Sequence, residues 1–360
     1  MAQKRWQGEM GTQDRVSGPL VSVTVPVYNG QDTVAQAIHS LLAQTYQDLE
    51  IIVVDDGSTD RTPEVLRSFG SAIRAIHQAN MGIAAARNTG LAAARGKFIA
   101  LMDCDDECEP ERIAAQVRFL LDHSNLVLCC SDFSAFNADG AVSTSYSQEY
   151  YHHCADDGVA KLYPLHGELD ISDCMADKPA HSVVVPIHFG MVYEELALGN
   201  FVHPPTALFR RFLLDSVGMF DPGIRIMCEW DWLVRVARVG AIGFIDRPLL
   251  RYRLSDTQVS ASEEAVTDSL RVASRICARD PVLLDHQPER FRRLFGELYA
   301  DAADIRAERH PLEALSLLAT SILRYHTVSR QTPRTLLKLL LPVSLIELFR
   351  SVVESLSFIV

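Results

Sequence analysis

The first hundred residues alternate between two spacings of hydrophobic positions. Residues 21–27 carry valine at every second position, which predicts a β-strand. Apolar side chains then recur at helical spacing over 34–42, and residues 51–54 form a continuous apolar run typical of a buried strand. The pattern continues with a helix near 61–69, a strand near 72–77, a helix near 83–94 and a strand at 98–102. This alternation predicts the α/β class, with a mainly parallel twisted sheet flanked by helices.

The pattern changes twice further along the chain. A helix over 111–121 and a strand over 126–130 precede a polar stretch rich in His and Tyr, which we interpret as a loop-rich insertion over the ligand edge. Helical periodicity returns over 264–326. We therefore expect a polar tail over 1–19, an α/β domain over 20–260 with its insertion at 137–200, and a helical extension with an amphipathic tail over 261–360.

Charge and cysteine content exclude several classes of protein. The 360 residues hold 34 Lys and Arg against 46 Asp and Glu, and this net charge of −12 argues against nucleic-acid binding, which needs a basic surface. The polar N-terminus lacks the apolar stretch of a signal peptide, and no stretch reaches the ~18 charge-poor apolar residues of a spanning helix. Without an export signal, the eight cysteines are expected to be thiols. These features predict a cytoplasmic protein.

Three polar clusters each follow a predicted strand. They are Tyr28-Asn29, Asp55-Asp56 and the acidic run Asp103-Cys104-Asp105-Asp106. Because ligands of open α/β sheets bind beyond the carboxyl ends of the strands, we expect these clusters to meet in one crevice. Neighbouring carboxylates repel one another unless a cation lies between them, so the acidic run suggests a Mg²⁺ or Mn²⁺ site. A solvated acidic loop at 103–106 and a simple turn with a helix cap at 55–58 are the alternatives.

Motifs that would indicate other chemistry are missing from the sequence. No G-x-G-x-x-G follows the first strand and no G-x-x-x-x-G-K-[ST] occurs, so dinucleotide and P-loop sites of those types are excluded. The G-x-S-x-G elbow and the H-E-x-x-H zinc motif do not occur either.

A series of motifs, taken in order, resembles the inverting glycosyltransferases of family 2, which have the GT-A fold. The matching segments are VSVTVPVYNG, EIIVVDDGSTD, NMGIAAARNTGLAAARGKFIALMDCDDECEPERI, GNFVHPPTALFRR, GMFDPGI, CEWDWLVRVARVG and PLLRYRL. They span residues 20–255, and their order, spacing and placement at strand ends together make the resemblance specific.

The resemblance implies a site for a nucleoside-diphosphate sugar. Asp103-Cys104-Asp105 matches the D-x-D motif of the family, so Asp105 and Asp103 are the expected ligands of a Mn²⁺ or Mg²⁺ ion that bridges the two phosphates. Arg87 resembles a partner of the diphosphate or of a carboxylate, although a solvent-facing helix arginine is the alternative. The expected donor-binding residues are Pro26, Tyr28, Asn29, Asp55, Asp56, Gly82, Arg87, Asp103, Asp106 and Trp232.

The segment CEWDW is expected to supply the catalytic base. Glu229 occupies the position at which the family carries a carboxylate, commonly Asp, that takes a proton from the acceptor hydroxyl. Glutamate is one methylene longer but has the same acid–base chemistry. Asp231 is the alternative base if the register is shifted by two residues. The family often has His where this chain has Ser255, so an extra metal ligand from that segment is doubtful.

The resemblance therefore implies a metal-dependent, inverting glycosyltransferase. Its expected donor is a nucleoside-diphosphate sugar, first of all a UDP-sugar, and its acceptor a hydroxyl of a saccharide or lipid-linked molecule. A protein that binds a nucleotide sugar without catalysis is one alternative. A nucleotidyltransferase is the less favoured alternative, because PVYNGQDT after the first strand carries neither Lys nor Arg.

The C-terminal tail differs in charge from the rest of the chain. From Arg324 to Arg350 there are five Arg or Lys and the single acid Glu347, among many leucines. Such a segment is typical of a helix that lies on an anionic membrane surface, at the inner face in this case, or that packs on its own domain or on a second copy. Pro342 must break or kink the helix.

Overall fold

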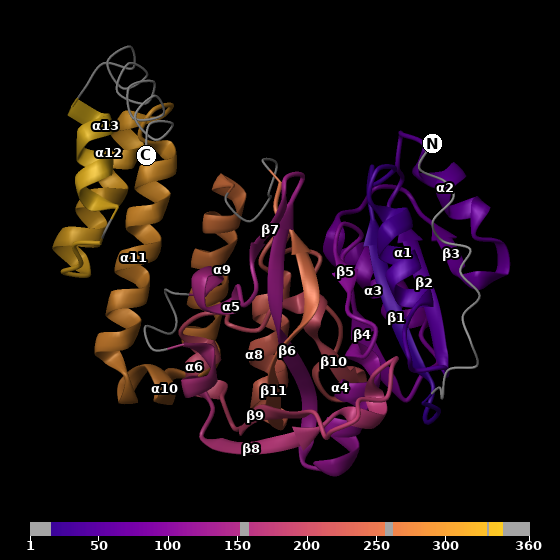
Figure 1. The fold of residues 1–360 in the computed structure, drawn as a ribbon. Helices are drawn as coiled ribbons and strands as arrows, with labels where there is room; N and C mark the ends of the chain where they lie inside the picture. Colours follow the sequence, from indigo (N-terminus) through magenta and orange to yellow (C-terminus); the bar gives the residue numbers. More distant parts are fainter. Residues whose placement is uncertain (1–15, 152–157, 256–261, 330, 341–360) are drawn as a thin grey trace. The chain divides into compact units, whose positions relative to one another are not determined.

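The computed structural model describes residues 16–151, 158–255, 262–329 and 331–340 (Figure 1). The chain divides into two compact units. The sheet unit comprises Met1–Leu196, Asn200–Pro222 and Trp232–Asp256. The helical unit comprises Ala197–Gly199, Gly223–Asp231 and Thr257–Val360.

Within the described residues, eleven strands form one sheet. Their bounds are β1 Val21–Val27, β2 Leu49–Asp55, β3 Arg74–His77, β4 Phe98–Leu101, β5 Glu107–Cys108, β6 Leu126–Asn137, β7 Gly140–Ser143, β8 Leu165–Asp170, β9 Val184–Gly190, β10 Leu208–Arg210 and β11 Ala241–Arg253. The order along the sheet is β3-β2-β1-β4-β10-β6-β11-β9-β8, with β5 paired to β11 and β7 to β6. Strands β3, β2, β1 and β4 are parallel, as are β6 and β11, whereas β10 and β9 run antiparallel to their neighbours.

The helices of the sheet unit follow the strands closely. Their bounds are α1 Val34–Leu42, α2 Thr62–Ser68, α3 Ile83–Ala93, α4 Arg112–Asp122, α5 Ser147–Tyr150, α6 Tyr193–Ala197, α7 Leu213–Val217 and α8 Cys228–Val239, of which α6 and α8 cross the unit boundary. Helix α1 buries Val34, Ala37, Ile38 and Leu41, which share one face at helical spacing. All seven residues of β1 are buried, as expected for a parallel strand covered on both faces.

The parallel strands end at a common edge of the sheet. Val27 at the end of β1 is paired with Asp55 at the end of β2, and the Asp56 N–H donates to the Val27 carbonyl at 2.8 Å. Strand β4 lies on the other side of β1, with Leu101 in register with Thr24. The three polar clusters therefore follow neighbouring strands, as the sequence predicted, and the α/β fold class is confirmed.

The segment over 137–200 is more regular than the sequence indicated. Strand β9 pairs with β11, and β8 pairs with β9, so this segment extends the sheet. The interpretation of this segment as irregular was wrong, because β8 is largely exposed and lacks a clear apolar alternation. Tyr163, which follows a short 3₁₀ helix, and Ile187 in β9 are buried, so side chains of the segment contribute to the core.

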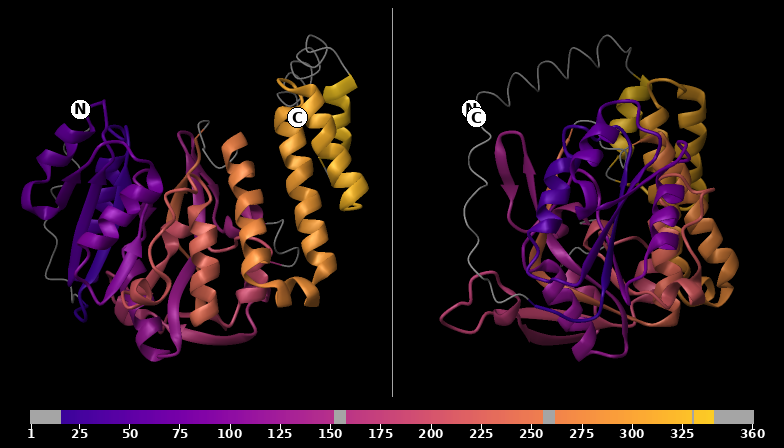
Figure 2. Two further views of the ribbon diagram at one scale, coloured as in Figure 1. Left: turned by 180° about the vertical axis from the view of Figure 1, so that it is seen from behind. Right: turned by 90° about the vertical axis from the view of Figure 1, so that its right-hand side faces the viewer.

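In the helical unit the long helix α11 packs beside α9, α12 and α13 (Figure 2). Their bounds are α9 Glu263–Arg279, α10 Pro281–His286, α11 Pro288–Arg306, α12 Pro311–Ala319, a π-helical turn Thr320–Arg324, and α13 Thr332–Leu340. Ser262 caps α9 by accepting the Ala265 N–H, and Asp280 caps α10 by accepting the Leu283 N–H. Residues 341–360, which hold most of the predicted tail, lie outside the described residues. None of the described helices is long and apolar enough to span a bilayer.

Candidate active site

The first polar cluster forms a tight loop after β1. Asn29 adopts a left-handed conformation with φ 52°, which asparagine tolerates better than most residues. Its backbone N–H donates to Ser58 Oγ at 2.9 Å, and its Oδ1 accepts the Thr59 N–H at 2.8 Å. Pro26 is buried within β1, whereas the Tyr28 side chain is half exposed. Of the expected donor-binding residues in this cluster, Tyr28 therefore presents the accessible ring.

The second cluster joins β2 to the loop before α3. Asp55 accepts the Ser58 N–H at 2.9 Å, and its other oxygen lies 2.9 Å from His77 Nδ1. The buried Asp56 carboxylate accepts three hydrogen bonds, from the Gln78 amide at 2.7 Å and from the Met81 and Gly82 N–H groups at 3.0 and 2.8 Å. A carboxylate has about four lone-pair sites, so Asp56 keeps one for a ligand donor.

The start of α3 brings a glycine and an arginine to the same edge. Gly82 has φ +86°, and no atom lies within 4 Å of the position that a Cβ would take, so the backbone conformation rather than a close contact requires glycine there. Arg87 is buried, and its guanidinium donates to Asp103 Oδ1 at 2.9 Å while lying over the Phe220 ring. The solvent-facing alternative for Arg87 is therefore wrong, and its observed partner is a carboxylate.

The third cluster concentrates negative charge after β4. Burial and the neighbouring carboxylate of Asp103 raise the pKa of Asp105 to about 6. Burial and the carboxylates of Asp105 and Asp103 raise the pKa of Asp106 well above its usual value. Asp106 Oδ1 accepts the Arg253 N–H at 3.0 Å, but Oδ2 has no hydrogen-bond partner in the part of the chain that the structure describes. Burying an unsatisfied carboxylate oxygen is costly, so this cluster is suited to binding a cation.

Two arginines that the sequence analysis assigned no role lie close to the acidic run, and the charge of one of them, Arg112, partly offsets the rise in the pKa of Asp106. Arg253, at the end of β11, donates through Nε to the Asp105 carbonyl at 2.8 Å and contacts Glu107. Arg112 is fully buried and donates to the Leu101 carbonyl at 2.9 Å. Arg253 lies in PLLRYRL, one of the segments that resemble the family. No local pattern, however, indicated that this arginine would contact the acidic run.

The donor set fits a divalent cation that is shared with phosphate. Mg²⁺ bound together with a nucleotide commonly takes one or two protein carboxylates and completes its shell with phosphate oxygens and water. Asp103 and Asp105 can supply these carboxylates. Among the residues described, no group of three His, Cys, Asp or Glu is arranged as a complete metal cage.

Helix α8 carries the expected catalytic carboxylates in its first turn. Glu229 is half buried, and the Cys228 thiol donates to its Oε2 at 3.3 Å. Asp231 is almost fully buried and forms an ion pair with Arg279 at 2.9 Å. A general base must be able to reach the proton that it removes, so the burial and pairing of Asp231 favour Glu229.

Trp232 lies in the core of the sheet unit instead of at a donor-facing surface. Its side chain is fully buried, its indole N–H donates to the Gly218 carbonyl at 2.9 Å, and its ring packs against Phe209 and Phe220. We correct the expectation that Trp232 contacts the donor. The large indole ring is buried by core packing, and its N–H already has a hydrogen-bond partner there. Phe220, which packs against Trp232, also lies under the guanidinium of Arg87.

An aromatic cluster lies beside the acidic run. The half-buried rings of Tyr146, Tyr150 and Tyr252 lie 5.8 to 6.3 Å apart, and Tyr252 directly precedes Arg253. Beneath them Phe133 stacks on His203 at 4.2 Å. Burial, with the positive charges of Arg112 and Arg87, lowers the pKa of His203 to about 3, so its imidazole is neutral at physiological pH. Aromatic faces of this kind can pack against the apolar faces of a ligand.

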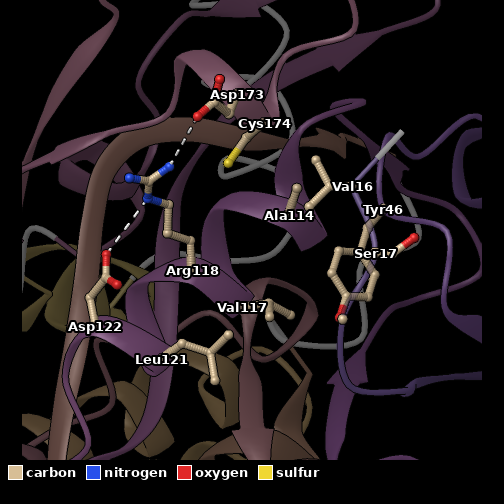
Figure 3. A pocket seen from close by; sticks show the side chains of 11 residues that line it. Val16, Ser17, Tyr46, Ala114, Val117, Arg118, Leu121, Asp122, Asp173 and Cys174 are labelled. Atoms are coloured by element: carbon tan, nitrogen blue, oxygen red, sulfur yellow. Dashed lines mark ion pairs between the residues drawn. The ribbon is translucent and has the colours of Figure 1, made fainter. Parts of the chain in front are cut away.

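A separate hollow lies against α4, on the sheet unit (Figure 3). It measures about 290 Å³ and is lined by Tyr46, Val117, Leu121 and Cys174 among others. Its arginine, Arg118, lies 3.6 Å from Asp122 and 3.7 Å from Asp173, so its charge is already balanced. None of the expected site residues lines this hollow.

Comparisons with known proteins agree with the arrangement of the strand ends. The sequence model of the family described as Glycosyl transferase family 2 matches residues 22–162. A Rickettsia prowazekii (strain Madrid E) protein, "Uncharacterized glycosyltransferase RP339", is 28% identical over 251 residues, which cover 69% of this chain and 68% of that protein. The match to a second relative, from Rickettsia typhi, covers 66% of that protein, so the chain spans about two thirds of these relatives.

Two solved structures show the same fold at low sequence identity. Staphylococcus aureus TarS 1-349, in complex with UDP-GlcNAc, has a TM-score of 0.51 at 16% identity, covering 86% of this chain and 93% of that one. The mannosyltransferase PcManGT from Pyrobaculum calidifontis, in complex with GDP-Man and Mn²⁺, has a TM-score of 0.53 at 18% identity, covering 91% and 87%. The fold is therefore GT-A, with C-terminal helices. The strand-end motifs, the match over residues 22–162 and the relatives named as glycosyltransferases all agree that this chain carries a glycosyltransferase family 2 domain.

Proposed function

We propose that this protein is a metal-dependent, inverting glycosyltransferase. Its donor is a nucleoside-diphosphate sugar, with a UDP-sugar as the first candidate, and its acceptor is a hydroxyl of a saccharide or a lipid-linked molecule. The observation that carries the proposal is the meeting of Asp56, Gly82, Asp103 and Asp105 at one edge of the sheet. The two solved neighbours are in complex with UDP-GlcNAc and with GDP-Man, so the shared fold does not determine the nucleotide base. The choice of UDP is therefore a separate, more specific proposal.

The acidic run would hold the metal, and the loops beside it would hold the nucleotide. Asp103 and Asp105 are the proposed carboxylate ligands, and the bound ion would supply positive charge to neutralise the departing diphosphate. Asp56 keeps one lone pair for a base N–H, and Tyr28 offers an exposed ring next to it in the strand-end loops. Gly82 leaves open space at the start of α3, where backbone N–H groups favour an anion.

Glu229 is the proposed general base. The acceptor oxygen attacks the anomeric carbon, the bond from that carbon to the diphosphate oxygen breaks, and the acceptor proton passes to the Glu229 carboxylate. A single displacement of this kind inverts the anomeric configuration. Asp231, paired with Arg279, would position the first turn of α8.

The aromatic cluster supports a saccharide acceptor. Tyr146, Tyr150 and Tyr252 offer partly exposed rings beside Arg253, which contacts both Asp105 and Asp106. We further propose that residues 20–260 form the catalytic domain, that 137–200 bound the acceptor side, and that 261–360 form a helical extension. A cytoplasmic location is proposed with them.

Release of the nucleoside diphosphate from a panel of donors tests the proposal. The protein is incubated with UDP- and GDP-sugars, with Mn²⁺ or Mg²⁺ and with excess chelator, with and without simple saccharide acceptors. We expect metal-dependent release from one donor, and its loss in Glu229→Gln when an acceptor is present. Nucleotide binding without turnover of any donor would instead favour the non-catalytic alternative.

A further inference from the structure

The helical unit exposes an unusual number of leucines on its last helices. Leu312 is 84% exposed, Leu323 is 74% exposed and Leu340 is 79% exposed. We call the following set the leucine face: Leu312, Leu315, Leu323, Val328, Leu336, Leu337 and Leu340. Single exposed leucines are normal, but a set gathered on adjacent elements marks an interaction surface.

These leucines face away from the packed side of the helices. Leu312, Leu315 and Leu323 are spaced by three and eight residues, which places them along one side of α12 and its π-helical continuation. The opposite side buries Ala314 and Leu318 against α11. In α13, Leu336, Leu337 and Leu340 share one face in the same way.

Polar contacts hold α13 in this orientation. Lys338 Nζ lies 2.8 Å from Asp304 Oδ2, and the Thr335 hydroxyl donates to Asp304 Oδ1 at 3.1 Å. Thr335 is fully buried. Figures 1 and 2 show α12 and α13 lying along α11. Because these contacts hold one side of α13 against α11, the leucines on its other side remain exposed.

The charge around the leucine face is positive, although the whole chain is acidic. Between residues 312 and 340 the sequence holds the single acid Glu313 against four bases: Arg324, Arg330, Arg334 and Lys338. Among the described residues, Asp304 pairs with Lys338 and lies 3.7 Å from Arg334, and Glu313 lies 3.4 Å from Arg306. An excess of positive charge therefore remains along these helices, and an anionic lipid surface attracts such charge.

We propose that the leucine face docks this protein on an anionic lipid surface. The proposal goes beyond the proposed transferase activity, because it concerns the helical unit alone and requires no turnover. A second copy of the chain fits the face less well. In a two-fold dimer the same surface meets itself, so Arg324 and Arg334 of one copy would oppose those of the other. Anionic lipid instead offers apolar contact to the leucines and opposite charge to the arginines.

Vesicle flotation with the full chain tests the proposal. The probes are vesicles of phosphatidylcholine with 30% phosphatidylglycerol and vesicles of phosphatidylcholine alone. We expect the protein to float with the anionic vesicles at low salt, to float at least tenfold less with the neutral ones, and to detach as the salt is raised to 0.5 M. A protein that remains in the buffer with anionic vesicles at low salt would overturn the proposal.

A matched pair of double variants assigns the effect to the leucine face. Leu312→Asp with Leu340→Asp should reduce the partition onto anionic vesicles at least tenfold. Leu42→Asp with Leu121→Asp makes the same chemical change at two exposed leucines of the sheet unit and should leave partition within twofold. Unchanged helical circular dichroism and donor turnover confirm that both variants are folded. Equal losses in the two pairs would refute a specific face.

Two further outcomes separate the competing occupants. If Leu345→Asp with Leu348→Asp abolishes flotation while the leucine-face pair keeps it, residues beyond Leu340 bind the lipid and the proposal is wrong. If the wild-type chain is a dimer by light scattering, the leucine-face pair is a monomer, and neither floats, a second copy covers the face. Donor turnover is measured separately, so failure of docking and failure of the proposed function are distinguishable.

Discussion

Glu229 and Asp231 lie two residues apart at the start of α8, and conservative substitutions should separate catalysis from stability. Glu229→Gln keeps the shape and removes the base. Loss of a positioned general base typically lowers the rate by ~10²–10⁴-fold, or about 3–5 kcal/mol in the barrier. We expect this loss in the turnover number for transfer to an acceptor, with nucleotide affinity within about twofold of the wild type.

Asp231→Asn should have the opposite profile. The Asp231 side chain is 2% exposed and lies 2.9 Å from Arg279, so the substitution removes the negative charge of this ion pair. Breaking a fully buried pair costs roughly 3–5 kcal/mol. Because the Arg279 side chain is 48% exposed and can be hydrated again, we expect about 1–2 kcal/mol of lost stability in the helical unit. Transfer per folded molecule should fall less than tenfold.

The assay combines single-turnover transfer with urea unfolding of the same preparations. Fluorescence and far-UV circular dichroism follow unfolding, because the two units need not unfold together. Arg279→Lys serves as the control, since it retains the charge and should lose less stability than Asp231→Asn. The reasoning is refuted if Asp231→Asn is inactive while folded and Glu229→Gln transfers normally, which would shift the base by two residues.

Three further predictions concern other residues. Asp105→Asn should weaken donor binding in Mn²⁺ by at least tenfold in calorimetric titrations while leaving the melting temperature nearly unchanged, and full turnover in excess chelator would contradict the metal proposal. Asp56→Asn should raise the Michaelis constant for the donor several-fold. The carboxylate accepts hydrogen bonds from Gln78, Met81 and Gly82, and an amide oxygen can accept fewer of them. An unchanged Michaelis constant would exclude a role of Asp56 in donor binding. Burial and the charges of Glu297 and Asp304 raise the pKa of Asp301 to about 6, so this carboxyl costs stability above pH 6, costs less as the pH falls toward 4 and costs nothing below it. Asp301→Asn should therefore stabilise the helical unit at pH 8 by up to about 2–3 kcal/mol and have little effect at pH 4, as measured by urea unfolding, and equal effects at both pH values would contradict the assignment.

The sequence predicted the strand-end clusters well because they depend on local order. A buried strand has a distinctive apolar run, and the residue at which the run stops is visible in the sequence. Asp55 follows such a run, and so does Asp103. Parallel strands all end at one edge, so their convergence required no knowledge of long-range contacts.

The contacts around the acidic run could not be predicted in this way. Arg253 and Asp106 are separated by 147 positions, and they meet because β11 pairs with β5 and with β6. No local period encodes which distant strands become neighbours. The burial of Trp232 was also hidden, since an aromatic residue in a motif has the same local pattern whether it faces a ligand or the core.

The positions of the arginines give the electrostatic reason for proposing a metal. Arg87 is paired with Asp103, and the guanidinium of Arg253 is shared with the Asp105 carbonyl and Glu107. The charge of Arg253 offsets only part of the rise in the pKa of Asp105 that burial and Asp103 cause, and Asp106 Oδ2 has no partner among the described residues. A donor diphosphate would add about two negative charges to this cluster, and unit charges 4 Å apart interact by roughly 4 kcal/mol at an effective dielectric constant of 20. Under the proposed function, this repulsion is the reason for expecting a divalent ion, which Asp103 and Asp105 would hold beside the phosphates.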